Sequence, residues 1–487
     1  MKKKIMITLS ILLCLVVLFV GINLVDAPRA KFSVGIEIDD SSPDSFVKSI
    51  MKAPSFERAN AFYRLWSLTE PPNVDIEADE IFMKYRRMHD PQFDNKKYID
   101  EWKKGKENSF SGTMFEGKNY KKFTEKRKAL LDKYGTFDSH VSSGKLNDWV
   151  SEILTHKEAV RELKALSGIY FERYEKMVAC DIIDEFTHLS KDSNEIIFPN
   201  FLAWLQQAKL YNAVYMLDSL EGNWENGVKK ILLQFDFCKR STKSNRFLLT
   251  TLISRAIMRE SLYALANLMN SPNFPPKLYD TIIQGLPPLQ YEELGTRISL
   301  LFEGYVLGHQ NYGWFLFQEN RTRQYFYDAI SRLINTDKLP PYEWKGYPLD
   351  NLQVKTGLFW WLQNAKGKIA FDKMITKNEG HFFYNLYVSI FKAYFLKSVY
   401  DMTRISAELH KTYTQDGVTG KPVQEILNGL ETYRTWLDPT TGKPYKWDNK
   451  KQLLYGFGLD MDDDGGRISH DSMDGDVPLP VILYVKK

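Results

Sequence analysis

The chain is poor in cysteine, with three among its 487 residues and no Cys-x-x-Cys pair. A zinc site made of cysteine thiolates needs several of them at short spacing, so that class of site is excluded. Cys180 and Cys238 lie outside the N-terminal apolar run, each in an apolar helical segment. Their spacing leaves two interpretations open, one disulfide or two buried free thiols.

The chain also lacks an excess of charge of one sign. Its 65 Lys and Arg residues nearly balance its 61 Asp and Glu residues, which gives a formal net charge of +4. The two signs are interspersed and form no basic stripe, which argues against nucleic acid as the main partner. Because 44% of the residues are hydrophobic, the chain can bury a core. Its length predicts two or three domains.

Short motifs of common enzymes are missing as well. No Gly-x-Ser-x-Gly turn occurs, and the Gly-Lys of GVTGKPV precedes a proline where a phosphate-binding loop needs Ser or Thr. Glu185 and His188 have the Glu-x-x-His spacing of a di-iron bundle, but no second copy accompanies them. We interpret them as part of a solvated helix face, and we predict no catalytic residue.

The N-terminus carries a long apolar run. Lysines at positions 2–4 precede residues 5–25, an uncharged stretch long enough to cross about 30 Å of hydrocarbon as a helix. Small residues before Ala27 leave cleavage as a signal peptide open, whereas Pro28 and the length of the run favour an uncleaved anchor. The positive-inside rule then predicts a single-pass protein of the bacterial inner membrane whose bulk is periplasmic or extracytoplasmic.

Hydrophobic patterns with the 3.6-residue period of α-helices dominate residues 146–397. Within 246–269, five residues fall on one face of a predicted amphipathic helix: Leu249, Leu252, Ile253, Ala256 and Ile257. Before it, the tripeptide 221–223 (Glu-Gly-Asn) separates two amphipathic segments and predicts a helical hairpin. This hairpin resembles one unit of a tetratricopeptide-type repeat, although no second copy follows at a 34-residue period.

A second apolar stretch, residues 384–400, requires a choice between a membrane span and a buried helix. Lys392 and Lys397 interrupt it. Because lysine is costly in the hydrocarbon core, we predict a buried, aromatic-rich helix.

The C-terminal part contains a series of motifs. A helix through DMTRISAELHKTY is followed by a polar turn, a short helix, LDPTTGKPYKW, LLYGFGLD and DDDGG. In this order, residues 398–477 resemble the globular part of type II secretion pseudopilins. The chain as a whole resembles a group of large bacterial envelope proteins that end in the same motifs, which implies no particular activity.

The correspondence with pseudopilins can be followed by position. Residues matching the family's first strand motif, with one extra residue before the glycine, are Asp438, Pro439, Gly442, Pro444 and Tyr445. Residues matching the second strand motif and the loop glycines are Leu454, Tyr455, Gly458, Asp460, Gly465 and Gly466. The family's N-terminal processing signature is missing and a long body precedes these motifs, so assembly into a pilus fibre is not expected.

An acidic loop, LDMDDDGGRISHDSMDGD, spans residues 459–476. Calcium binds about six to eight oxygens, which aspartates and turned backbone carbonyls supply. The resemblance implies a calcium loop, and the candidate ligands are Asp460, Asp462, Asp464, Asp474 and Asp476. Asp463 and Asp471 are equally compatible with facing water, and the alternative for the whole loop is a solvated acidic turn. A bound ion would be structural and would hold the C-terminal strand.

We therefore predict a mainly α protein, in which stacked, tetratricopeptide-like helical hairpins precede a small α+β pseudopilin-like domain. The predicted units are a signal or membrane anchor (1–27), a mixed, partly loop-rich region (28–145), the helical-hairpin body (146–397) and the pseudopilin-like domain (398–487). The predicted function is a membrane-anchored, non-enzymatic interaction scaffold for a protein partner, with a structural calcium loop. An accessory subunit of a type II secretion or pilus-like system and an envelope enzyme are the alternatives.

Overall fold

The computed structural model describes most of the chain after the N-terminal segment. The described residues are 31–34, 37–39, 41–50, 57–89, 118–134, 149–187, 198–309, 319–344, 381–415, 421–458, 460–467 and 477–483. The predicted membrane segment lies outside them, as do residues 345–380. Among the described residues, no helix is long and apolar enough to cross a membrane.

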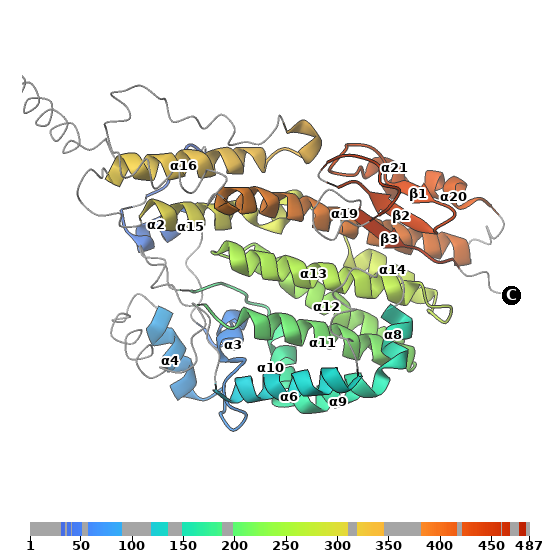
Figure 1. Cartoon of the computed structure of the whole chain (residues 1–487), viewed down its shortest axis with the longest axis horizontal. Helices are drawn as coiled ribbons and strands as arrows, with labels where there is room; N and C mark the ends of the chain where they lie inside the picture. The colour runs from blue at the N-terminus through green and yellow to red at the C-terminus, as the bar shows by residue number, and fades with distance from the viewer. Residues whose placement is uncertain are drawn as a thin grey trace, which may run out of the picture.

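Helices make up most of the described chain, which confirms the prediction of a mainly α protein (Figure 1). In the first part they are α2 (Pro43–Ile50), α3 (Ala61–Ser67), α4 (Asp79–His89), α6 (Lys118–Tyr134), α8 (Trp149–Thr155), α9 (Lys157–Ser167) and α10 (Ile169–Val178). In the middle they are α11 (Phe201–Leu220), α12 (Trp224–Thr242), α13 (Leu248–Met269), α14 (Lys277–Gly285), η2 (Tyr291–Leu294), α15 (Thr296–Gly308), α16 (Glu319–Thr336) and η3 (Pro341–Glu343). The last are α19 (His381–Gln415), α20 (Val423–Gly429) and α21 (Glu431–Thr435).

A small antiparallel sheet lies near the C-terminus. Its strands are β1 (Lys446–Asp448), β2 (Leu453–Gly456) and β3 (Val477–Pro480), in the order β1-β2-β3. In the register, Lys446 lies opposite Tyr455 and Leu454 lies opposite Leu479. With α20 and α21, the sheet lies at one end of the long helix α19 (Figure 1).

The predicted hairpin is present as α11 and α12, which are joined by the turn at residues 221–223. The two helices approach closely at Gly227. A Cβ atom there would lie 2.0 Å from the Oγ of Ser219 and 2.4 Å from the carbonyl oxygen of Tyr215. Only glycine allows this separation, so Gly227 fixes how the hairpin packs.

The next helix, α13, lies in the middle of the body, between α11 and α19 (Figure 1). The residues of its predicted apolar face are buried to different degrees. Ile257 is fully buried, and Leu249, Leu252 and Ile253 pack against the core but remain partly exposed, as does Ala256. Polar residues of α13 face the core as well. The hydroxyl of Ser254 donates to the carbonyl of Thr250 (2.9 Å), and that of Ser261 donates to the carbonyl of Ile257 (3.0 Å). Hydroxyls that are satisfied within their own helix can be buried at little cost.

The 35-residue helix α19 connects the helical body to the sheet. It runs through the predicted boundary between residues 397 and 398, and it packs on α13, α14 and β3. The hydroxyl of Tyr400 donates to the carbonyl of Pro287, and the guanidinium of Arg404 donates to the carbonyl of Ile283. The stretch predicted as a buried helix is helical, with Ile390 and Phe391 fully buried, while Lys392 is exposed.

Residues 90–145 belong to the region predicted to be mixed and partly loop-rich, and they contain α6, a helix of 17 residues. Tyr120 and Phe123 of α6 are buried. The ring centroid of Tyr120 lies 5.2 Å from that of Tyr170 in α10. Two aromatic residues therefore attach this polar segment to the core, and the rest of the range lies outside the described residues.

Candidate functional site

The described part of the acidic loop, residues 460–467, follows β2 and passes beside β1. The carboxylate of Asp460 accepts the backbone N–H of Asp462 at 3.1 Å, and both side chains are exposed. Asp464 is partly buried. Asp471, Asp474 and Asp476 lie outside the described residues, so the structure places three of the five predicted ligands.

Asp463 is the aspartate that is bonded to the sheet, although its sequence pattern is equally compatible with a water-facing side chain. Lys446 of β1 forms an ion pair with one carboxylate oxygen. The other oxygen accepts the hydroxyl of Tyr455 at 3.1 Å and the N–H of Gly465 at 3.0 Å. The bond from Lys446 lowers the pKa of Asp463. The loop is therefore attached to both strands of the hairpin through this carboxylate.

The backbone conformation of the loop requires glycine at positions 465 and 466. Gly465 and Gly466 have φ angles of +64° and +73°. A Cβ atom on Gly466 would lie 2.2 Å from a methyl carbon of Leu453, and the ammonium of Lys451 bonds to the carbonyl of Gly465. This turn packs against β2, so it is a formed structure and not a solvated tail.

The fit to calcium can be tested on the described residues. Among them, no three Asp, Glu, His or Cys side chains lie close enough together to hold a metal ion. The ammonium groups of Lys446 and Lys451 already bond to oxygens of Asp463 and Gly465. The described half of the loop therefore does not form a calcium site by itself, and a complete ligand set would need Asp474 or Asp476.

The C-terminal strand has a second attachment that needs no ion. Asn270, which follows α13, donates from Nδ2 to the carbonyl of Pro480 at 2.9 Å. Its Oδ1 accepts the N–H of Ile482 at 2.9 Å. The side-chain amide thus makes the two hydrogen bonds that a neighbouring strand would make, and it holds the end of β3 against the helical body.

The Asp-Pro motif forms a buried turn. The carboxylate of Asp438 accepts the N–H of Thr441 at 3.0 Å and its hydroxyl at 2.8 Å, while Ser398 of α19 donates at 3.2 Å. Burial raises the pKa of Asp438. The motif therefore serves to attach the turn before β1 to α19.

One turn along α19, Asp401 completes this attachment. The ammonium of Lys397 donates to both oxygens of its buried carboxylate (2.9 and 2.7 Å), and the hydroxyl of Tyr445 donates to one of them at 3.0 Å. The side chain of Asp401 is fully buried, and burial raises its pKa. Sequence reasoning missed this residue, although its spacing of four from Lys397 is a signal for a helical ion pair.

Glu185 was interpreted as part of a solvated helix face, and this is wrong. It lies outside the helices, in the segment that follows α10, and is 1% exposed. One carboxylate oxygen accepts the backbone N–H groups of Arg246 (2.6 Å) and Phe247 (3.3 Å), and the other accepts the hydroxyl of Thr250 (3.0 Å). Phe247 precedes α13 and has no side-chain acceptor, so a carboxylate from a distant segment caps that helix instead.

A second carboxylate shares this helix terminus. Glu303 of α15 accepts the N–H of Leu248 at 3.3 Å. Burial raises the pKa of Glu185 to about 7, and burial together with the charge of Glu185 raises the pKa of Glu303 to about 7. His188, the partner in the supposed di-iron motif, lies outside the described residues.

The free energy of unfolding should depend on these two carboxylates. Because their pKa values are higher in the folded state, folding binds protons, and stability should fall as pH rises from 4.5 through about 7. We expect each carboxylate to contribute a loss of about 2 kcal/mol in urea unfolding between pH 5 and pH 8. Glu185→Gln should remove much of this slope, whereas Glu158→Gln, at an exposed position, should not. An unchanged slope in Glu185→Gln would contradict the assignment.

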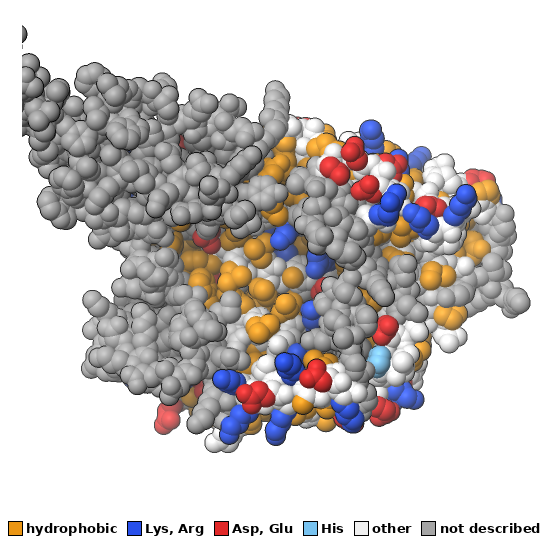
Figure 2. Space-filling model, viewed as in Figure 1, with side chains coloured by type: hydrophobic (Ala, Val, Ile, Leu, Met, Phe, Trp, Pro, Cys, Tyr) orange, Lys and Arg blue, Asp and Glu red, His pale blue; other side chains and the backbone are white. Residues whose placement is uncertain are grey.

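One face of the body has an apolar area. Figure 2 shows this area in the middle of the view, over the first half of α13 and between it and α11. From these two helices we assign to it six exposed or partly exposed residues, which we call the apolar stripe: Leu202, Leu205, Leu249, Leu252, Ile253 and Ala256. Leu202 is 54% exposed. Exposed apolar area of this kind is typical of interaction surfaces.

Three cationic side chains lie beside the apolar stripe, one from each of α11, α13 and α19. We call Lys209, Arg259 and Lys392 the cationic edge. The charge of Arg259 acts on Lys392, and the charges of Arg259 and Lys209 act on Glu260, which places the four groups together. Glu260 is buried, and its Oε2 has no hydrogen-bond partner among the described residues.

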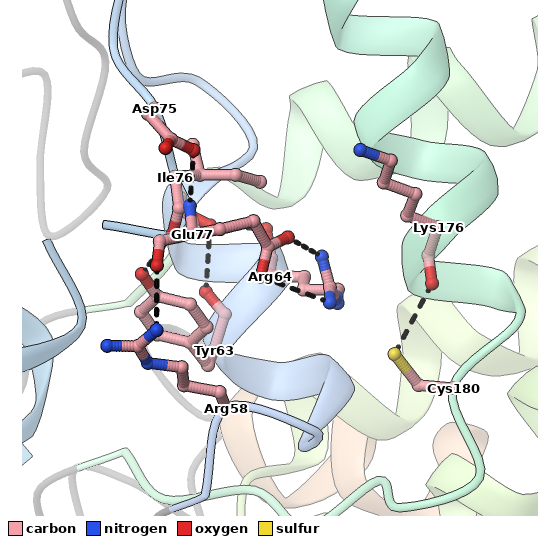
Figure 3. A network of polar contacts seen from close by, with 9 residues as sticks. Arg58, Tyr63, Arg64, Asp75, Ile76, Glu77, Lys176 and Cys180 are labelled. Carbon is pink, nitrogen blue, oxygen red and sulfur yellow. Dashed lines mark hydrogen bonds and ion pairs between the residues drawn. The ribbon is translucent and has the colours of Figure 1, made fainter. Parts of the chain in front are cut away.

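A separate network near the N-terminus is structural. Arg64 and Glu77 form an ion pair, Arg58 donates to the carbonyl of Glu77 at 2.8 Å, and Tyr63 donates to the carbonyl of Ile76 (Figure 3). These bonds hold the loop after α3.

Both described cysteines are free thiols. Cys180, near this network, donates to the carbonyl of Lys176, and burial raises its pKa.

Comparisons of the chain with protein-family models, with curated proteins and with solved structures give no match. The function must therefore be argued from the residues themselves.

Proposed function

We propose that the protein is a membrane-anchored component of the bacterial envelope, and that its helical body is a non-enzymatic scaffold for a protein partner. The observation that carries this proposal is the apolar stripe. Stacked helices present extended surfaces that suit peptide and protein partners. The N-terminal apolar run would hold this surface on the outer side of the inner membrane.

Site-specific crosslinking in living cells tests the scaffold. A photo-reactive phenylalanine analogue placed at Leu252, in the full-length chain, should crosslink to a discrete protein. The same analogue at Lys229, whose side chain on α12 is 61% exposed, should not. Equal crosslinking from both positions, or none from Leu252, would argue against the scaffold. Membrane fractionation and protease accessibility of the same cells test the anchor and its orientation.

The calcium loop belongs to this proposal as a structural element. It is supported by the two left-handed glycines and by the aspartates on both sides of them. If an ion completes the loop, millimolar calcium should raise the melting temperature by several degrees, because a ligand that binds only the folded state stabilises it. Asp460→Asn should abolish this rise, and Asp236→Asn, on α12, should leave it unchanged. A melting temperature that is the same in calcium and in chelator rules out the ion.

A second candidate is an accessory subunit of a type II secretion or pilus-like system. The order of elements favours it, since a long helix, two short helices, a hairpin, an acidic loop and a closing strand follow one another from α19 to β3. Co-purification of the full-length protein with secretion components in mild detergent would separate this candidate from the general scaffold.

A further inference from the structure

We propose that the apolar stripe and the cationic edge together bind an acidic amphipathic helix of a partner protein. This inference rests on the proposed scaffold and names the class of partner. The apolar side chains of the partner helix would lie on the apolar stripe, and its carboxylates would contact the cationic edge.

The first argument is the arrangement along the two helices. On α11, Leu202, Leu205 and Lys209 follow one another at spacings of three and four residues, which is one helical face. Residues 249, 252, 256 and 259 repeat this pattern on α13. On both helices the residues change from apolar to cationic in the same direction. This is because α12 runs back between α11 and α13, so these two helices point the same way (Figure 1). Two adjacent helices with this order offer a third helix a surface to lie along.

The second argument is charge. Lys209 and Lys392 form no ion pair with the described residues, and Arg259 has only Glu260, with 3.5 Å between Nη2 and Oε1. Partial desolvation and then the charge of Arg259 lower the pKa of Lys392, and the second of these causes is repulsion between two cations. Carboxylates of a bound partner would reduce the repulsion among the cations of the cationic edge. Electrostatic complementarity of this kind selects the partner and its register.

The third argument is Glu260. Its side chain is 9% exposed, and its Oε2 has no partner among the described residues. Burial raises the pKa of Glu260, and its ion pair with the cationic edge is the 3.5 Å contact from Arg259. This one buried carboxylate therefore balances only part of the charge of the three cations, and a partner that brings further carboxylates would balance the rest.

Binding of a designed probe tests the inference. The full-length protein in nanodiscs of neutral lipid is titrated into a fluorescent, leucine- and glutamate-based amphipathic helix, and anisotropy is measured. We expect binding that weakens at high salt, and none of a leucine- and lysine-based helix of equal length. Arg259→Glu with Lys392→Glu should weaken the acidic helix by about tenfold or more and admit the basic helix.

Control variants separate the surface from the fold. Lys229→Glu on α12 changes the same charge away from the face and should leave binding unchanged. Leu202→Asp should abolish binding without lowering the melting temperature, because Leu202 is 54% exposed. Equal binding of both helices, or equal weakening by Lys229→Glu, overturns the inference. Binding to vesicles of anionic lipid, without binding of the acidic helix, would assign the surface to a membrane.

The two proposals fail in different ways. Crosslinking from Leu252 to a protein, without binding of the acidic probe, would leave the scaffold standing and remove the acidic helix. Binding of the probe without any cellular crosslink would show the chemistry of the surface but contradict its use as a scaffold.

Discussion

Arg255→Ala is expected to lower the free energy of unfolding by about 3 kcal/mol or more, the loss that follows when several buried acceptors are left unpaired. Arg255 of α13 is 3% exposed. Its Nε donates to the carbonyl of Leu294 at 3.0 Å, its Nη1 donates to the carbonyl of Ser389 at 2.9 Å, and its Nη2 also bonds to Thr296. One guanidinium thus joins α13, α15 and α19.

Urea unfolding measures this effect, and α12 supplies the control. Lys229 has 61% of its side chain exposed and pairs with Glu225 on the surface, so Lys229→Ala should change stability by no more than about 0.5 kcal/mol. Arg255→Lys keeps the charge but cannot reach three acceptors, so it should be nearly as destabilising as alanine. Similar losses for Arg255→Ala and Lys229→Ala would show that the buried bonds contribute little.

Gly227→Ala should have the second large effect, a loss of about 3 kcal/mol, because overpacking forces backbone and side chains apart. The added Cβ would meet the Oγ of Ser219 at 2.0 Å and the carbonyl oxygen of Tyr215 at 2.4 Å. The side chain can rotate away, but the carbonyl belongs to the backbone of α11. The hairpin can therefore accommodate the methyl group only by separating its two helices.

Two further variants sharpen this measurement. Gly429→Ala, at the end of α20, meets nothing within 4 Å and should leave the melting temperature nearly unchanged. Ser219→Ala in the Gly227→Ala background should recover only part of the loss, since the clash with the carbonyl of Tyr215 remains. Full recovery would mean that the hydroxyl, and not the helix separation, is the cause.

Much of the secondary structure follows from local signals. The tripeptide 221–223 separates α11 from α12 as predicted, because glycine and asparagine end helices. β1 begins within the motif LDPTTGKPYKW, β2 lies within LLYGFGLD, and β3 follows the acidic loop as the predicted C-terminal strand. These signals act over a few residues, so a single sequence contains them completely.

Contacts between distant segments were not predictable in the same way. Glu185 caps α13 from about sixty positions earlier in the chain. Asp463 bonds to Lys446 rather than to water, and Asp401 holds Tyr445. A carboxylate has the same sequence pattern whether it is solvated, caps a helix or pairs with lysine. The choice depends on which backbone N–H groups and cations the fold brings to it.

The sequence by itself determined the helical class, the main hairpin, the strand segments and the position of the acidic loop, because these depend on periodicity and turn residues. Only the tertiary structure decided which side of α13 is buried. Its serines and threonines satisfy their hydroxyls within the helix, and Arg255 finds carbonyls on two neighbouring helices. The polar side therefore packs inward at low cost, and the leucines of the predicted apolar face border the core and remain partly exposed.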